Sequence, residues 1–188
     1  MRTGTKQRGF TLIEMLTVIA IIALLAAILV PVAGHAKSSA LKRRAMLEMN
    51  SIKVAVMQFY ADHNFMPWGD PEDPNLVRVG PDAWTKNNAE QKNIMRWLTG
   101  ENPLKKVYLQ LPEKSHAEED PLIFVDPWKQ NYRIGLDRDL DGAMLPNDPD
   151  GLYGGENYVR ERVLVYSLGD PADEPRKPMQ TFDYIPNP

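Results

Sequence analysis

The sequence predicts an α+β protein in which one long N-terminal helix packs on a small antiparallel β-sheet head. Three observations support this fold class. Residues 10–33 form an apolar segment of membrane-spanning length, and residues 34–62 continue it with helical periodicity and no proline. Further along the chain, residues 121–136 and 160–168 have the composition of short β-strands.

The first nine residues form a basic leader, 1–9, which contains Arg2, Lys6 and Arg8 and no acidic residue. The whole chain has a net charge of −3, so the part that follows the leader is at −6. This balance disfavours nucleic acid as a partner. The 188 residues include no cysteine, so disulfide bonds and thiolate chemistry are excluded.

Residues 10–33 predict a membrane-spanning helix. Fourteen of these 24 residues are Phe, Leu, Ile or Val, and Glu14 is the single charge. At 1.5 Å per residue the segment is roughly 36 Å long, enough to cross the hydrocarbon core. An ordinary signal anchor is one interpretation. A cleaved secretory signal fits poorly, because the run is long and no Ala-x-Ala site clearly closes it.

Two residues at the start of this segment indicate more than an anchor. A carboxylate such as Glu14 is costly in lipid and is usually retained for a partner. Gly9 places a small, flexible residue between the leader and the apolar run. If a peptidase cuts after Gly9, the amine of Phe10 becomes the new N-terminus, one helical turn from Glu14. The two charges then neutralise each other, within one chain or between neighbours.

The sequence KQRGFTLIEM at residues 6–15 resembles the processing motif of type IV prepilins and of type II secretion pseudopilins. The resemblance implies a pilin-like fold for the α+β chain. It also implies that the prepilin peptidase, a membrane aspartyl peptidase, cuts after Gly9 and methylates the amine of Phe10. In these families the glutamate at the position of Glu14 helps to dock each subunit into a filament.

Basic residues flank both ends of the predicted span, since Lys37 and residues 42–44 follow it. The positive-inside rule alone therefore does not set the orientation. The resemblance implies a single-pass protein of the bacterial inner membrane, with its leader in the cytoplasm and its head in the periplasm.

Residues 34–62 predict an amphipathic continuation of the same helix. One face carries apolar residues at spacings of three and four, namely Leu41, Ala45, Met49, Ile52, Val56 and Phe59. The opposite face, expected to be polar, carries Lys42, Arg43, Glu48 and Lys53. The helix is expected to end near residue 62, because Asn64 and Pro67 follow.

Residues 63–188 predict a globular head. Residues 65–120 read as loops with a short helix at 88–98, and the two strand segments are expected to pair and to pack on the long helix. Trp68, Trp84 and Trp97 fit either a binding surface or a small core, and the core interpretation is favoured.

The two strand segments also carry a narrower resemblance. Asp126-Pro127-Trp128 and the later sequence VYSLGD at 165–170 are similar to segments in the head of the major pseudopilin of type II secretion. Lys129 stands where that family has glycine, and the sequence DPAD at 170–173 replaces a glycine-rich end.

An acidic loop between the strands has the spacing of a twelve-residue calcium loop. Asp137, Asp139 and Asp141 occupy positions one, three and five, Ala143 offers its carbonyl at seven, and Asp148 closes the loop at twelve. Asp150 is an additional candidate ligand, and major pseudopilins carry calcium in this part of the head. The alternative interpretation is a solvated acidic turn, because Asp and Gly favour turns in any case.

No catalytic motif accompanies these features, so the chain is not expected to be an enzyme. The predicted function is a structural subunit of a type II secretion pseudopilus, which self-associates into a filament. The resemblance implies minor pseudopilins and an inner-membrane assembly platform as partners. The alternatives are a type IV pilin or minor pilin for adhesion, motility or DNA uptake, and a membrane-tethered enzyme or binding module.

Overall fold

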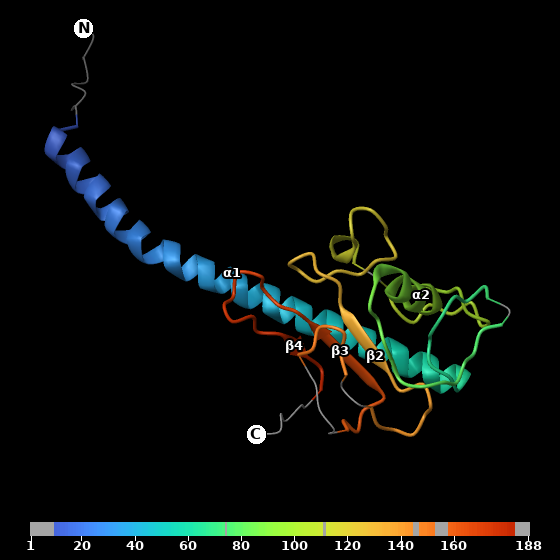
Figure 1. The fold of residues 1–188 in the computed structure, drawn as a ribbon. Coiled ribbons are helices and arrows are strands. Elements are labelled where there is room, and N and C mark those ends of the chain that lie inside the picture. Colours follow the sequence, from blue (N-terminus) through green and yellow to red (C-terminus); the bar gives the residue numbers. More distant parts are fainter. Residues whose placement is uncertain (1–9, 74, 111, 145–146, 153–157, 183–188) are drawn as a thin grey trace, which may run out of the picture. The chain divides into compact units, whose positions relative to one another are not determined.

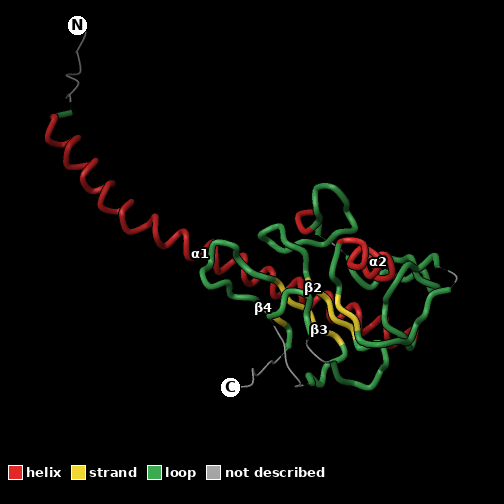
Figure 2. The backbone as a smooth tube through the Cα atoms, viewed as in Figure 1, coloured by secondary structure: helices red, strands yellow, loops and turns green. Residues whose placement is uncertain are grey.

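The computed structural model describes residues 10–73, 75–110, 112–144, 147–152 and 158–182. In chain order, its elements are α1 (Leu12–His63), β1 (Ala83–Trp84), α2 (Asn88–Leu98), the 3-10 turn η1 (Glu113–Ser115), β2 (Arg133–Leu136), β3 (Val163–Ser167) and β4 (Met179–Gln180). Figures 1 and 2 show these helices and strands. The α+β prediction is confirmed. The chain divides into two compact units, 1–41 and 42–188.

The first unit contains the apolar half of α1. Its segment Leu12–Leu29 has a mean hydropathy of 2.8, and none of its residues is buried. It is the one described segment that is long and apolar enough to cross a membrane. Apolar side chains surround this part of the helix, so no single face is selected for packing against a head.

The second unit is built on a four-stranded antiparallel sheet of order β1-β2-β3-β4. Arg133 pairs with Tyr166 and Leu136 with Val163, so β2 and β3 match along their length. Every residue of β3 is buried. The predicted strand pair is therefore confirmed at 133–136 and 163–167, and two short edge strands extend it.

The expectation of a strand that begins at residue 121 was wrong. Within the described residues, Phe124 and Val125 form only isolated bridges, to His116 and Asn131 respectively. Prolines at 121 and 127 lack the N–H that a ladder requires. The carboxylate of Asp126 instead accepts hydrogen bonds from the backbone N–H of Trp128 and Gln130, at 2.9 Å each, which makes a turn.

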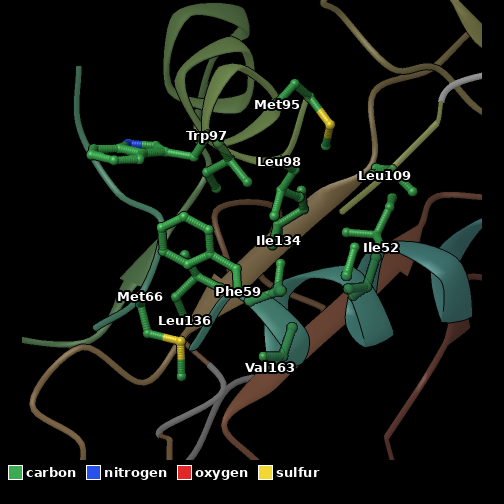
Figure 3. Packing of buried hydrophobic residues seen from close by; sticks show 14 of the residues in the cluster. Ile52, Phe59, Met66, Met95, Trp97, Leu98, Leu109, Ile134, Leu136 and Val163 are labelled. Carbon is green, nitrogen blue, oxygen red and sulfur yellow. The ribbon is translucent and has the colours of Figure 1, made fainter. Parts of the chain in front are cut away.

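The main core lies between the head half of α1, the sheet and α2. The core residues labelled in Figure 3 come from these elements, except Met66 and Leu109, which lie in the segments that follow α1 and α2. The helix contributes Met49, Ile52, Val56 and Phe59, all at 0% exposure, and the sheet contributes Ile134, Leu136, Val163 and Val165. The predicted apolar stripe of the helix is confirmed, because these positions follow the three- and four-residue spacing.

A second, smaller core covers the other face of the sheet. It contains Trp84, Met144, Val159, Leu164, Tyr166 and Phe182. Because side chains alternate along a strand, Leu164 and Tyr166 point away from the face that α1 covers. Trp84 and Trp97 are 6% and 3% exposed, so the core interpretation of these tryptophans is confirmed.

Candidate functional site

The N-terminal site lies where α1 begins. Gly9 is outside the described residues, and Phe10 is the first described residue, with its side chain 77% exposed. The side chain of Glu14 folds back toward the first residues of the helix. Its Oε2 accepts hydrogen bonds from the backbone N–H of Thr11 at 2.8 Å and from the Thr11 hydroxyl at 2.6 Å.

Thr11 completes this arrangement as a capping residue. The backbone N–H of Glu14 donates to the Thr11 hydroxyl oxygen at 3.3 Å, so the two residues satisfy each other as a capping box. Sequence reasoning missed Thr11, although Thr-x-x-Glu ahead of an apolar run is a recognised signal of a helix start. The carboxylate is thus held beside the position at which a cleaved chain would present its amine.

Glu48 lies in the core and not on the polar face, so that part of the sequence prediction was wrong. It is 7% exposed. Its two oxygens accept hydrogen bonds from the hydroxyls of Tyr132 and Ser115, each at 2.6 Å. The guanidinium of Arg44 lies 2.8 Å from the same carboxylate. The helical phase of Glu48, four residues before buried Ile52, was the signal that sequence reasoning overlooked.

The acidic loop is ordered around Asp137, which is fully buried. Its carboxylate accepts hydrogen bonds from the backbone N–H of Leu140 at 2.7 Å and of Gly142 at 3.0 Å. Leu140 and Gly142 have φ values of 65° and 88°, which produce the tight turn. Burial raises the pKa of Asp137 above its ordinary value.

The structure adds Asp82 to this loop. Carboxylate oxygens of Asp82, Asp137 and Asp139 all lie within 4.8 Å of one another. The antiparallel pairing of Ala83 with Leu136 places the residues before β1 beside those after β2. Burial and the neighbouring carboxylates, Asp139 first, raise the pKa of Asp82 to about 6. No sequence signal identified Asp82, because its partners lie more than fifty residues further along the chain.

The other predicted calcium ligands have different surroundings. Asp141 is exposed and accepts a hydrogen bond from the backbone N–H of Ala143 at 2.8 Å. Asp148 accepts one from the hydroxyl of Tyr166 at 2.9 Å, beside the second core. Asp150 forms an ion pair with Arg133 at 2.7 Å. Among the residues that the structure describes, Asp82, Asp137 and Asp139 are therefore the three carboxylates that lie close enough together to share one cation.

The fold and the N-terminal site together define a prepilin-type subunit, with one membrane-length helix that begins in a Thr–Glu cap and continues into a small head. The family model for the prokaryotic N-terminal methylation motif matches residues 4–30. Type II secretion system core protein G of Escherichia coli K12 is 37% identical over 161 residues, which cover 85% of this chain and 93% of that protein. The Pectobacterium carotovorum protein of the same name is 35% identical over 161 residues, 84% of this chain and 86% of its own length. The chain therefore belongs to the type II secretion system core protein G family.

Fimbrial proteins match over a shorter range. Fimbrial protein EcpB of Eikenella corrodens is 42% identical over 73 residues, which cover 39% of this chain and 45% of EcpB. The type IV major pilin PilE1 of Neisseria gonorrhoeae is 39% identical over 68 residues, 36% of this chain and 32% of that pilin. The chain thus spans less than half the length of these two relatives. No solved structure matches the chain significantly.

Proposed function

We propose that this chain is the filament-forming pseudopilin of a type II secretion machine and catalyses no reaction itself. The observation that carries the proposal is the similarity to core protein G, which extends over 85% of the chain and includes the head. The exposed apolar half of α1 supports it, because this surface needs lipid before assembly and other subunits afterwards.

Each part of the N-terminal site has a role in this function. The prepilin peptidase cuts between Gly9 and Phe10 and methylates the new amine. The Glu14 carboxylate then gives up its hydrogen bonds to Thr11 and forms an ion pair with an N-terminal amine. Before assembly the protein sits in the bacterial inner membrane with its head in the periplasm. Minor pseudopilins and the inner-membrane assembly platform are the proposed partners in building the filament.

The test compares the proteins in culture supernatant from strains with and without this gene. In the deletion strain, proteins with signal peptides should remain in the periplasm, and the wild-type gene should restore their export. The Gly9→Ala variant should fail to restore export, and mass spectrometry should find its leader still attached. Normal export from the deletion strain would refute the proposal.

A type IV pilin is the second candidate, favoured by the 42% identity to a fimbrial protein over 73 residues. The same strains separate the two functions. Intact secretion combined with a loss of surface pili, twitching or DNA uptake would identify the chain as a type IV pilin.

We also propose that the head binds calcium through Asp82, Asp137 and Asp139. Three carboxylates within 4.8 Å of one another offer hard oxygen ligands, and Asp137 is fully buried. The cation nearest to Asp137 among the described ion pairs is Arg162, whose Nε is 4.0 Å away. A bound Ca²⁺ would neutralise the carboxylates and tie the segment before β1 to the loop after β2. The spacing of the acidic loop also predicts three ligands that are not part of this cluster, namely Asp141, Ala143 and Asp148.

Thermal unfolding of the full-length protein in detergent tests this site and chooses between the two ligand sets. Calcium should raise the melting temperature relative to chelator, because it binds only the folded head; at 100 times Kd the gain is about 2.7 kcal/mol. Asp82→Asn should abolish the shift while Asp148→Asn keeps it. The opposite result would favour the spacing-based site, and no shift in the wild type would remove calcium altogether.

A further inference from the structure

A small pocket lies in the head where the segment around β1 meets the start of α2. Its volume is about 200 Å³, below the roughly 300–1,000 Å³ of sites for drug-sized ligands. The pocket is within the unit 42–188. Its walls combine two tryptophans with four polar side chains, namely Trp68, Trp84, Asp82, Lys86, Glu90 and Asn147. A ligand of this pocket is therefore small and meets both aromatic and polar groups.

Contacts with neighbouring residues hold both tryptophans in place. The guanidinium of Arg138 lies 5.3 Å from the ring centroid of Trp68 and donates to the carbonyl of Val77 at 3.0 Å. Trp84 lies against Gly135, where a Cβ would be only 2.9 Å from its ring. A ligand therefore meets rings that are already positioned, which reduces the entropy that binding costs.

Several hydrogen-bonding groups at this pocket are unused. Among the described residues, the buried indole N–H of Trp84 has no acceptor. In the same part of the chain, no hydrogen bond or ion pair engages the indole N–H of Trp68, the ammonium of Lys86 or the amide of Asn147. A buried donor without a partner is rare in folded proteins and indicates that a ligand or water supplies the acceptor.

Two carboxylates provide acceptors at the same pocket. Glu90 is fixed at the start of α2, because its Oε2 accepts a hydrogen bond from the backbone N–H of Lys86 at 2.6 Å. Asp82 accepts one from the backbone N–H of Arg138 at 3.3 Å. Each carboxylate retains further lone pairs for a ligand. Two acids against one ammonium disfavour an anionic ligand.

We infer that this pocket binds a single neutral sugar ring, either free or at the end of a glycan chain. Sugar hydroxyls both donate and accept hydrogen bonds, so they complement the unused donors and the two carboxylates. Trp68 is half-buried and retains ring surface on which the C–H face of a sugar can pack. An apolar ligand would instead cover the polar groups without pairing them.

Fluorine NMR of the full-length protein tests the site, because two of the four tryptophans line the pocket and two lie outside it. The protein is labelled with 5-fluorotryptophan and kept with chelator in a detergent without a sugar headgroup. Glucose, galactose, mannose and N-acetylglucosamine are added to about 50 mM, above the millimolar Kd expected for so small a ligand. The Trp68 and Trp84 resonances should shift saturably with at least one sugar, while those of Trp97 and Trp128 stay unchanged.

Two pairs of variants locate the binding residues. Lys86→Met should raise Kd at least tenfold, whereas Lys114→Met, at an exposed lysine outside the pocket, should leave it unchanged. Trp68→Ala should abolish binding, and Trp128→Ala is its control, because Trp128 is a half-buried tryptophan outside the pocket. Equal unfolding curves of the two lysine variants would show that folding is not the cause. Wild-type Kd for both Lys86→Met and Trp68→Ala overturns the inference.

The choice of ligand decides the remaining outcomes. Saturable shifts with cell-wall glycan fragments but not with free monosaccharides would support the inference and identify a chain end as the source. Shifts with free amino acids such as alanine, and with none of the sugars, would assign the pocket to a zwitterion and overturn it. Equal shifts at all four tryptophans, or none at any, would also overturn it. These results leave the proposed role in secretion intact, because that role is tested by export.

Discussion

The two halves of α1 belong to one helix but serve different surroundings. Residues 12–29 are apolar on all sides and wholly exposed. In the head half, an apolar stripe that includes Met49, Val56 and Phe59 is fully buried, and most of the remaining residues are polar or exposed. The protein's own sheet can cover an apolar stripe, whereas a helix that is apolar on all sides must be covered by lipid or by other subunits. The burial pattern therefore separates the part of the helix that folds from the part that assembles.

The largest expected difference between the two halves comes from substituting one large side chain in each. Phe59→Ala removes a ring that contacts His63 at 4.3 Å and Trp97 at 5.6 Å between ring centroids. We expect it to lower the free energy of unfolding of the head by about 3–5 kcal/mol. Leu25→Ala, in the exposed half, should leave head unfolding unchanged. Denaturant unfolding in detergent, followed by tryptophan fluorescence, measures both, and equal losses would contradict the comparison.

The two glutamates of α1 sharpen the comparison. Glu48→Ala leaves the hydroxyls of Tyr132 and Ser115 without their buried acceptor, which should cost about 2–4 kcal/mol of head stability. Glu14→Ala should leave head stability and membrane insertion unchanged and reduce filament yield. Melting curves and sheared-filament yields for both variants provide the check. Wild-type filament yield from Glu14→Ala would remove its docking role.

A pair of glycines extends the comparison to close packing. A Cβ on Gly135 would lie 2.9 Å from Cε2 and Cζ2 of Trp84, so Gly135→Ala should destabilise the head by about 1–3 kcal/mol. Apart from its chain neighbours and the backbone of its own helix, a Cβ on Gly34 in α1 would have no atom of the described residues within 4 Å. Gly34→Ala should therefore be neutral or slightly stabilising, since alanine favours a helix. Similar melting temperatures for the two variants would argue against the Trp84 contact.

The smallest expected effect is a pH dependence at the end of α1. Burial lowers the pKa of His63 below its ordinary value of 6.5, against the opposing charge of Asp62. The folded state then binds fewer protons than the unfolded state, so this contribution is complete above pH 6.5 and is lost as the pH falls through the folded pKa. Subtracting the His63→Gln profile of stability against pH from that of the wild type isolates it. A difference that grows as the pH falls would have the wrong sign.

The local patterns were sufficient for the long elements and failed where contacts are distant. The helix at 88–98 and the end of α1 near residue 62 were predictable from periodicity and breakers, and the structure places them at Asn88–Leu98 and His63. The strand predicted from residue 121 was wrong, because prolines and an Asp-centred turn outweigh its apolar composition. The helical phase of Glu48 indicates its burial, but the hydroxyls that bind its carboxylate lie 67 and 84 residues away, and a helical pattern cannot identify them.

The candidate sites divide in the same way. The sequence by itself was sufficient to predict the basic leader, the Gly9–Phe10 junction, the assembly role of Glu14 and the membrane-length helix, because each depends on neighbours within a few turns of chain. Only the tertiary structure brought Asp82 to Asp137 and Asp139. The physical reason is that strand pairing and burial connect residues that are far apart in the chain, and local periodicity carries no information about those pairings.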